Sequence, residues 1–498
     1  MIHRLTAALV IGLAAAGAAP AQTPLSASDW LSGSVQAPTR EASGWRPGDA
    51  RPPMRNRDGT AAGTDALREP ITPVARTGSV GRVTVSRLDS DDPDTAGTVT
   101  PAAAGLPGDL WNGSAADDLA RLIDRTPARL PAMTALMQRL LTAQLAPPVS
   151  DSSRGRLFLA RADRLLDMGD LDAARALLMQ QAGSGKPEVF RRLFDIALLD
   201  GDEIRACQMM NSTPGIAPSF PARIFCLAQS GDWSAAAIVF HGASDLGLMD
   251  PARNGLMLQF LDDSYVDSGQ ALVPPDPLTP LDLRILEAVG QPLPTSHLPI
   301  AFAHSDLRPN SGWKARLDAA ERLAAAGVLS PAEMLAIYSE QRPAASGGVW
   351  DRAAAVQALD RAIAAGNTAP DQELAEAAAT FASAGAEDVL AQMLAPRLPS
   401  LTADTPQAQA ALARLRAWMG QGDAPVTALP LPDPAQPPDA RKGEALLAAM
   451  ADIDAGIEGD DMRATRGLAA MAGLGLDSDA RLVAAQIALE RQQAARNR

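Results

Sequence analysis

Gly169-Asp170-Leu171-Asp172-Ala173-Ala174 is the first of three occurrences of one short phrase in this chain. The phrase returns as Gly201-Asp202-Glu203-Ile204-Arg205-Ala206 and as Gly231-Asp232-Trp233-Ser234-Ala235-Ala236, at spacings of 32 and 30 residues. Each Gly-Asp pair follows an apolar run with helical spacing and begins another one, so each predicts a turn between two helices. This period predicts helix–turn–helix units that bury their apolar faces on their neighbours.

The first of these units resembles a tetratricopeptide repeat. Four residues within Leu157–Ala182 stand at the small and large positions of the first helix, the turn and the small position of the second helix: Ala162, Leu165, Gly169 and Ala174. The second and third units have Phe194 and Ile224 in place of Ala162, which departs from the pattern. The resemblance covers about 90 residues and implies a superhelical stack of helix pairs. The alternative is an irregular helical domain with three coincidental Gly-Asp turns.

Composition favours helices throughout the 498 residues. Apolar residues make up 47% and aromatic residues only 4%, a difference that is largely alanine, the best helix former. We therefore predict an all-α fold, an α-solenoid of antiparallel helix pairs after a long disordered N-terminal arm. The net charge of −14 argues against nucleic acid and anionic lipid as main partners.

The first 21 residues have the features of a secretory signal peptide. Arg4 supplies the positive charge, Leu5–Ala16 is the apolar region, and Ala19-Pro20-Ala21 is a small-x-small cleavage site. No later run approaches the roughly 18 apolar residues of a membrane helix. The sequence predicts export to a bacterial periplasm, cleavage after Ala21 and no integral membrane span.

Residues 22–105 are predicted to form a mostly disordered arm. Trp45–Gly63 is rich in Pro, Gly, Arg and Asp, and Asp89–Asp94 is acidic, so little apolar surface is available to offset chain entropy. The island Leu25–Leu31 contains Trp30 and Leu31, which we treat as a candidate partner-binding motif. Three interpretations of this island stay open: it has no role, it folds back onto the helices, or it anchors a partner.

After the arm, composition and periodicity divide the chain into five segments. A helical entry with the repeats is followed by an irregular Pro-rich connection, a second helical block, a Pro-rich linker and a C-terminal helical cap: 106–250, 251–310, 311–422, 423–440 and 441–498. The last segment is either a cap on the stack or a small separate bundle.

The only cysteines, Cys207 and Cys226, are predicted to form a disulfide. They lie almost symmetrically about the loop Asn211–Phe220, between two consecutive helices that should be antiparallel. The alternative is a pair of buried free thiols.

Motifs for catalysis and cofactor binding are missing from the sequence. Gly183-Ser184-Gly185-Lys186-Pro187 lacks the first glycine and the final Ser/Thr of a phosphate loop. His297, His304 and Asp306 match no metal-binding spacing. We predict no cofactor, no metal and no catalytic residue.

The loop Ser346–Trp350 is the best small-site candidate. Gly347 and Gly348 permit close backbone approach, and Trp350 could stack on a sugar or peptide. The favoured interpretation is a connection between helices in which Trp350 is a packed anchor.

The whole layout resembles uncharacterised exported helical-repeat proteins of alpha-proteobacteria. It implies an exported scaffold that binds other proteins of the cell envelope and performs no catalysis. The alternative is a cell-wall (peptidoglycan) hydrolase, or its accessory subunit, with a superhelical α-domain. A cleft with one buried carboxylate would favour the hydrolase.

Overall fold

The structure is a computed structural model that describes residues 92–149, 154–213, 215–262, 272–422 and 429–496. The regular elements in these ranges are helices and two isolated β-bridges, with no strand, so the predicted all-α class is confirmed. None of these helices has the length and apolar character that a membrane crossing requires.

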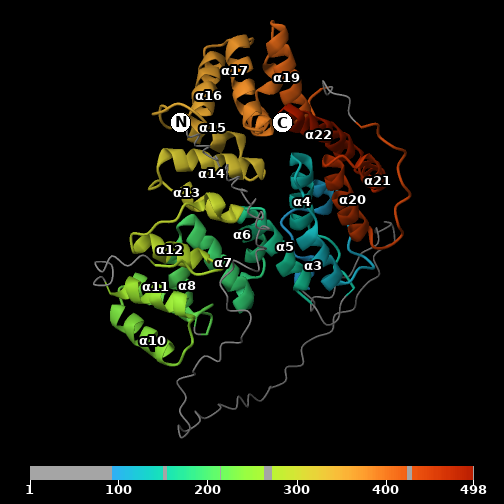
Figure 1. Ribbon diagram of the computed structural model, residues 1–498. Helices are drawn as coiled ribbons and strands as arrows, with labels where there is room; N and C mark the ends of the chain where they lie inside the picture. The colour runs from blue at the N-terminus through green and yellow to red at the C-terminus, as the bar shows by residue number, and fades with distance from the viewer. Residues whose placement is uncertain (1–91, 150–153, 214, 263–271, 423–428, 497–498) are drawn as a thin grey trace, which may run out of the picture.

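Figure 1 shows how the helices are arranged. The α-helices are α2 (Pro101–Ala104), α3 (Ala116–Arg125), α4 (Pro131–Thr142), α5 (Arg156–Asp167), α6 (Leu171–Met179), α7 (Pro187–Asp200), α8 (Glu203–Ser212), α9 (Phe220–Gln229), α10 (Trp233–Asp245), α11 (Pro251–Leu261), α12 (Pro280–Ala288), α13 (Ala303–Asp306), α14 (Trp313–Ala325), α15 (Pro331–Ser339), α16 (Val349–Ala364), α17 (Asp371–Ser383), α18 (Glu387–Leu394), α19 (Pro406–Trp418), α20 (Lys442–Ile457), α21 (Asp461–Gly473) and α22 (Asp477–Arg496). The short 3₁₀ helices are η1 (Pro93–Thr95), η2 (Ala182–Ser184), η4 (Thr295–His297), η5 (Ile300–Phe302) and η6 (Leu398–Ser400).

Consecutive helices from α5 to α12 pack against one another in chain order. This row runs from the centre of the molecule to its edge at α10 (Figure 1). Such nearest-neighbour packing is what a stack of helix pairs requires. A tetratricopeptide-like superhelix stays a prediction, because later helices also pack across the row.

Local capping chemistry explains where many helices begin. Ser330 and Glu333 form a reciprocal capping box at the start of α15, with backbone-to-side-chain distances of 2.9 and 3.3 Å. Thr279 and Asp282 form a second box at the start of α12. In both boxes a proline directly follows the N-cap residue and is the first residue of the helix, where no intrahelical N–H bond is lost.

The C-terminal helices return to the beginning of the fold. α20 packs on α3, and α22 packs on both α4 and α19. The buried side chain of Gln486 in α22 accepts a hydrogen bond from the Ala132 amide at 2.9 Å and donates one to the Trp418 carbonyl at 2.8 Å. Helices α20 and α22 therefore contact helices from early and late parts of the described chain, and the choice between a cap and a separate bundle stays a prediction.

The sequence predicted a disordered arm up to residue 105, but the described part of the chain already begins at Asp92 and contains η1 and α2 before Leu106. The carboxylate of Asp94 is buried and accepts hydrogen bonds from the amides of Gly155 at 3.0 Å and Phe158 at 2.7 Å. Asp94 thus caps the start of α5 from more than 60 residues away in sequence. The acidic composition around Asp94 concealed this role, because local sequence cannot identify a distant helix terminus.

Arg161 of α5 is fully buried and satisfies four backbone carbonyls. Nε donates to Leu141 at 2.7 Å, Nη2 to Ala143 at 2.8 Å, and Nη1 to Ala96 at 2.7 Å and Asp94 at 3.3 Å. Burial lowers the pKa of Arg161 to about 10, and the Asp94 charge opposes the shift. The side chain therefore stays charged at neutral pH and holds three separate segments together.

Replacing this guanidinium should strongly destabilise the fold. Arg161→Met keeps the volume but leaves buried carbonyls without donors, so we expect a loss of about 3 kcal/mol or more in unfolding free energy. Arg121→Met, at a surface pair whose arginine is 59% exposed, should change stability by less than about 0.5 kcal/mol. Urea unfolding of both variants checks this, and equal midpoints would contradict the role given to Arg161.

Candidate functional site

The three Gly-Asp phrases all lie at turns between helices. Gly169, Gly201 and Gly231 have φ values of 79°, 83° and 84°, the left-handed region that favours glycine. Asp170 and Asp232 cap the following helices, each accepting a bond from a backbone amide at 3.0 Å. Asp202 occupies the same position without a side-chain capping bond. The alanines that complete the phrases are buried: Ala174, Ala206 and Ala236.

Later parts of the chain cover the first two turns. A Cβ on Gly169 would lie 3.1 Å from Ile300, and His304 Nε2 is 2.7 Å from the Gly169 carbonyl oxygen. A Cβ on Gly201 would lie 3.1 Å from the Arg308 side chain. Burial lowers the pKa of His304, opposed by its bond to Gly169, which suits a neutral ring in packed surroundings.

The same later segment also occupies the side of α7. α12 and α13 pack on α7, and Arg284 of α12 donates to the carbonyls of Leu198 and Leu199 at 2.5 and 3.1 Å. These carbonyls belong to the last turn of α7, so Arg284 satisfies acceptors that lack intrahelical partners. Surfaces that an open helical stack would offer to a partner are here filled by residues of the chain itself.

The third turn, at Gly231, and one face of α10, the helix after it, are not covered by other described segments. No described atom lies within 4 Å of a Cβ placed on Gly231. Along α10, Ile238, Gly242 and Leu246 are four residues apart and therefore share one face. Ile238 is 73% exposed and Leu246 is 74% exposed. We call these three residues the α10 stripe.

Other large apolar side chains are exposed close to the stripe in sequence. Six of the eleven exposed large hydrophobic residues in the described chain lie between positions 204 and 248: Ile204, Met209, Trp233, Ile238, Leu246 and Leu248. Scattered single exposed hydrophobics are normal in proteins, so the stripe, whose members share one helical face, is the feature that indicates an interaction surface.

Trp233 is the exposed tryptophan that the sequence reasoning missed. Its side chain is 51% exposed, with its ring centroid 5.9 Å from Phe260, which lies 5.8 Å from Phe225. The Trp233 ring thus packs on Phe260 of α11, and Phe260 in turn packs on Phe225 of α9. About half of Trp233 stays exposed to solvent. A tryptophan directly after Asp232, at a position where the other phrases have Leu171 and Glu203, was the signal that could have found it.

The loop with Gly347 and Gly348 leads directly into the first turn of α16. Gly347 and Gly348 have positive φ values, and the Gly347 amide donates to Asp351 at 2.9 Å. Trp350 is half-buried and packs on Trp313, with ring centroids 5.2 Å apart. Its ring is therefore engaged by the protein, while partner binding at this loop stays a prediction. Trp30 and Leu31 lie outside the described residues.

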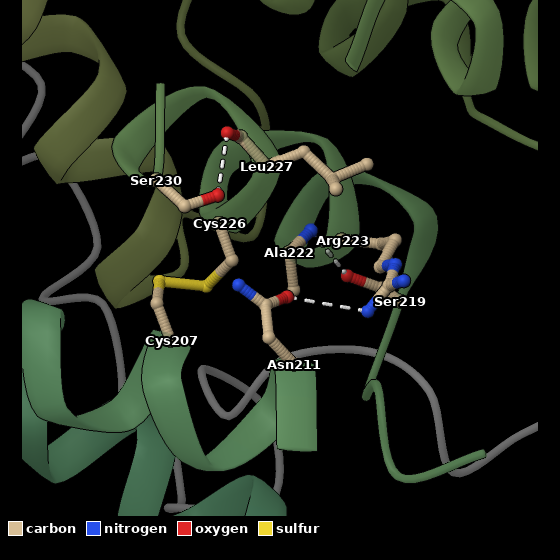
Figure 2. The surroundings of a disulfide bond; sticks show 8 residues. All are labelled: Cys207, Asn211, Ser219, Ala222, Arg223, Cys226, Leu227 and Ser230. Carbon is tan, nitrogen blue, oxygen red and sulfur yellow. Dashed lines mark hydrogen bonds between the residues drawn. A yellow bond between two sulfur atoms is a disulfide. The ribbon is translucent and has the colours of Figure 1, made fainter. Parts of the chain in front are cut away.

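The disulfide links α8 to α9 (Figure 2). Cys207 and Cys226 are both buried and their Cα atoms are 5.0 Å apart. The intervening turn is closed further by Arg223, which donates to Asn211 at 3.3 Å. The bond therefore fixes α9, the helix against which α10 packs.

We expect the disulfide to form in the exported protein and to stabilise it. Closing a loop with a sequence separation of 19 residues corresponds to roughly 3 kcal/mol in the chain-entropy model. The Cys207→Ser, Cys226→Ser double variant should lose about that much in denaturant unfolding. Protein denatured without reductant should take up no maleimide, and labelling of both thiols under that condition would contradict the bond.

Two acidic groups, Asp388 of α18 and Glu490 of α22, are close enough to interact electrostatically. Burial raises the pKa of Asp388 to about 6, opposed by the Val389 amide and reinforced by Glu490 and Glu387. Burial also raises the pKa of Glu490, opposed by Arg129. Among the described residues, no group of three or more His, Cys, Asp or Glu is placed to hold a metal ion.

The Asp388 shift predicts a pH-dependent stability. Because the folded pKa is above the unfolded value, the folded state binds the extra proton between about pH 4 and 6, and stability falls as pH rises through that window. Asp388→Asn should therefore exceed wild type by about 1–2 kcal/mol at pH 8 and match it near pH 4.

Thermal or urea unfolding across this pH range checks the effect. Asp172→Asn, at a side chain that is 93% exposed, is the control and should show no such trend. A constant difference between Asp388→Asn and wild type at all pH values would contradict a titrating Asp388.

Comparison with known proteins gives no match to any family model and none to a curated protein.

Proposed function

We propose that this chain is an exported helical scaffold that binds other proteins of the bacterial cell envelope and does not act as a catalyst. The observation that supports it is the α10 stripe, where Ile238 and Leu246 are exposed beside the open Gly242. Protein interfaces have apolar and aromatic centres, and Trp233 on the same helix is of the residue type most enriched there.

The position of the stripe favours a protein partner over a small molecule. α10 lies at the edge of the molecule (Figure 1), and Ile238 and Leu246 on it are 73% and 74% exposed, whereas small-molecule sites enclose most of their ligand. Such a surface suits the apolar face of another helix or an aromatic side chain.

Export is part of this proposal. It is supported by the signal-like residues 1–21 and by the disulfide. Mass spectrometry of the intact exported protein is expected to give the mass of a chain that begins at Gln22.

The competing proposal is a cell-wall hydrolase or its accessory subunit. The one observation that favours it is Asp388, because burial raises the pKa of this carboxyl to about 6, and a general acid needs a raised pKa. Hydrolysis of peptidoglycan by the purified chain that Asp388→Asn abolishes would favour this function over the scaffold.

Substitution of the stripe should remove the partners of the scaffold. In a crosslinking pull-down from periplasm, Ile238→Asp and Leu246→Asp should each lower partner recovery at least tenfold, because a charge replaces an apolar anchor. Both positions are solvent-exposed, so the fold should be kept. The control is Met462→Asp on α21, 84% exposed, and unchanged recovery with all three variants would contradict the proposal.

A further inference from the structure

We propose that the N-terminal segment Leu25–Leu31 occupies the α10 stripe of its own chain and thereby competes with partners. This inference rests on the proposed function, because it concerns the regulation of the same surface. Trp30 and Leu31 are the apolar side chains that would cover Ile238, Gly242 and Leu246.

The stripe has the shape to receive a bulky side chain. Gly242 stands between Ile238 and Leu246 on one helical face, and no described atom lies within 4 Å of a Cβ placed on it. An incoming aromatic ring can therefore approach the α10 backbone with an apolar side chain on each side. Among residues 238–246 Asp245 is the one acidic side chain and there is no Lys or Arg, so an apolar occupant that avoids Asp245 meets little desolvation penalty.

The chain outside the described residues is long enough to reach the stripe. The first described residue, Asp92, precedes η1, which packs on α5. From α5 to α10 there are five helix-to-helix steps, at most about 50 Å at the usual 8–10 Å spacing. The 60 residues from Ser32 to Asp91 span about 200 Å when extended and roughly 40–45 Å as a coil.

We call residues 32–91 the tether. Because its coil length matches the distance from α5 to α10, the segment Leu25–Leu31 has a high effective concentration at the stripe. The effective concentration of a flexible linker is highest when its root-mean-square length matches the span, so even a weak contact would be populated within one molecule. A partner would have to compete with this concentration, which sets a threshold for binding.

Charge also favours contact between the tether and the folded helices. Residues 32–91 contain nine arginines and seven acidic residues, a net charge of +2, whereas the whole chain carries −14. The part of the chain that the structure describes is therefore strongly acidic, and Coulomb attraction holds the tether near it at low salt.

Photo-crosslinking of the mature full-length chain tests the proposal. p-Benzoylphenylalanine replaces Trp30 in one protein and Trp45, the other tryptophan of the arm, in the control. We expect position 30 to crosslink to residues 233–248 of the same chain, at a yield independent of protein concentration, and position 45 to give at least tenfold less of this product. Peptide mass spectrometry locates the link.

Variants of the stripe make the test specific. Gly242→Leu fills the space and should lower the position-30 crosslink at least tenfold, whereas Gly255→Leu on α11, a helical glycine that is equally open, should leave it unchanged. Links from position 30 that scatter over the surface, or that join two chains in proportion to concentration, would overturn the proposal.

The outcome separates this inference from the scaffold function. If position 30 does not link to α10 while Ile238→Asp still loses its partners, only the docking of the segment is wrong. If the link forms and Ile238→Asp keeps its partners, the scaffold function of the stripe is wrong. When both hold, deletion of residues 22–33 should raise partner recovery with the wild-type stripe.

Discussion

The guanidinium of Arg161 is the constraint on which the arrangement of the other helices depends. Its donors are divided between the segment after η1, the end of α4 and the segment that follows α4, and the Asp94 carboxylate accepts hydrogen bonds from amides at the start of α5. Gly97 completes the junction, because a Cβ there would lie 2.4 Å from the Gln144 amide. Only a planar group with several donors can satisfy carbonyls in so many directions, so lysine would not substitute for it.

The orientation of α5 decides which surfaces of the later helices are free. The row from α6 to α11 continues from α5, and the segment from α12 to α13 folds back over α5 and α7. This return covers the turns at Gly169 and Gly201 and stops short of Gly231. The exposure of Ile238, Leu246 and Trp233 is thus a result of where the covering segment ends, and it explains why the surface proposed for binding lies at the edge of the molecule.

Much of the local structure could be predicted from sequence, because its causes are local. Gly-Asp turns, the Ser330 capping box and the pairing of Cys207 with Cys226 depend on residues close together in the chain. Asp94 and Gln486 could not be assigned, since their partners are more than 60 and more than 350 residues away. The same limit applies to the candidate site. The sequence drew attention to Trp350, whose ring packs on Trp313, and not to Trp233, because exposure depends on what the rest of the chain covers.

The return of α22 to α4 has a consequence for biosynthesis. The Ala132 amide and the Gln486 side chain that it meets are separated by 354 residues. At typical translation rates the ribosome needs roughly 20–70 s to make the intervening chain. During that interval α3 and α4 lack the apolar partners that α20 and α22 later provide, so the newly made N-terminal half is a natural client for chaperones. A premature stop anywhere before α22 would release a chain that keeps this exposed surface permanently.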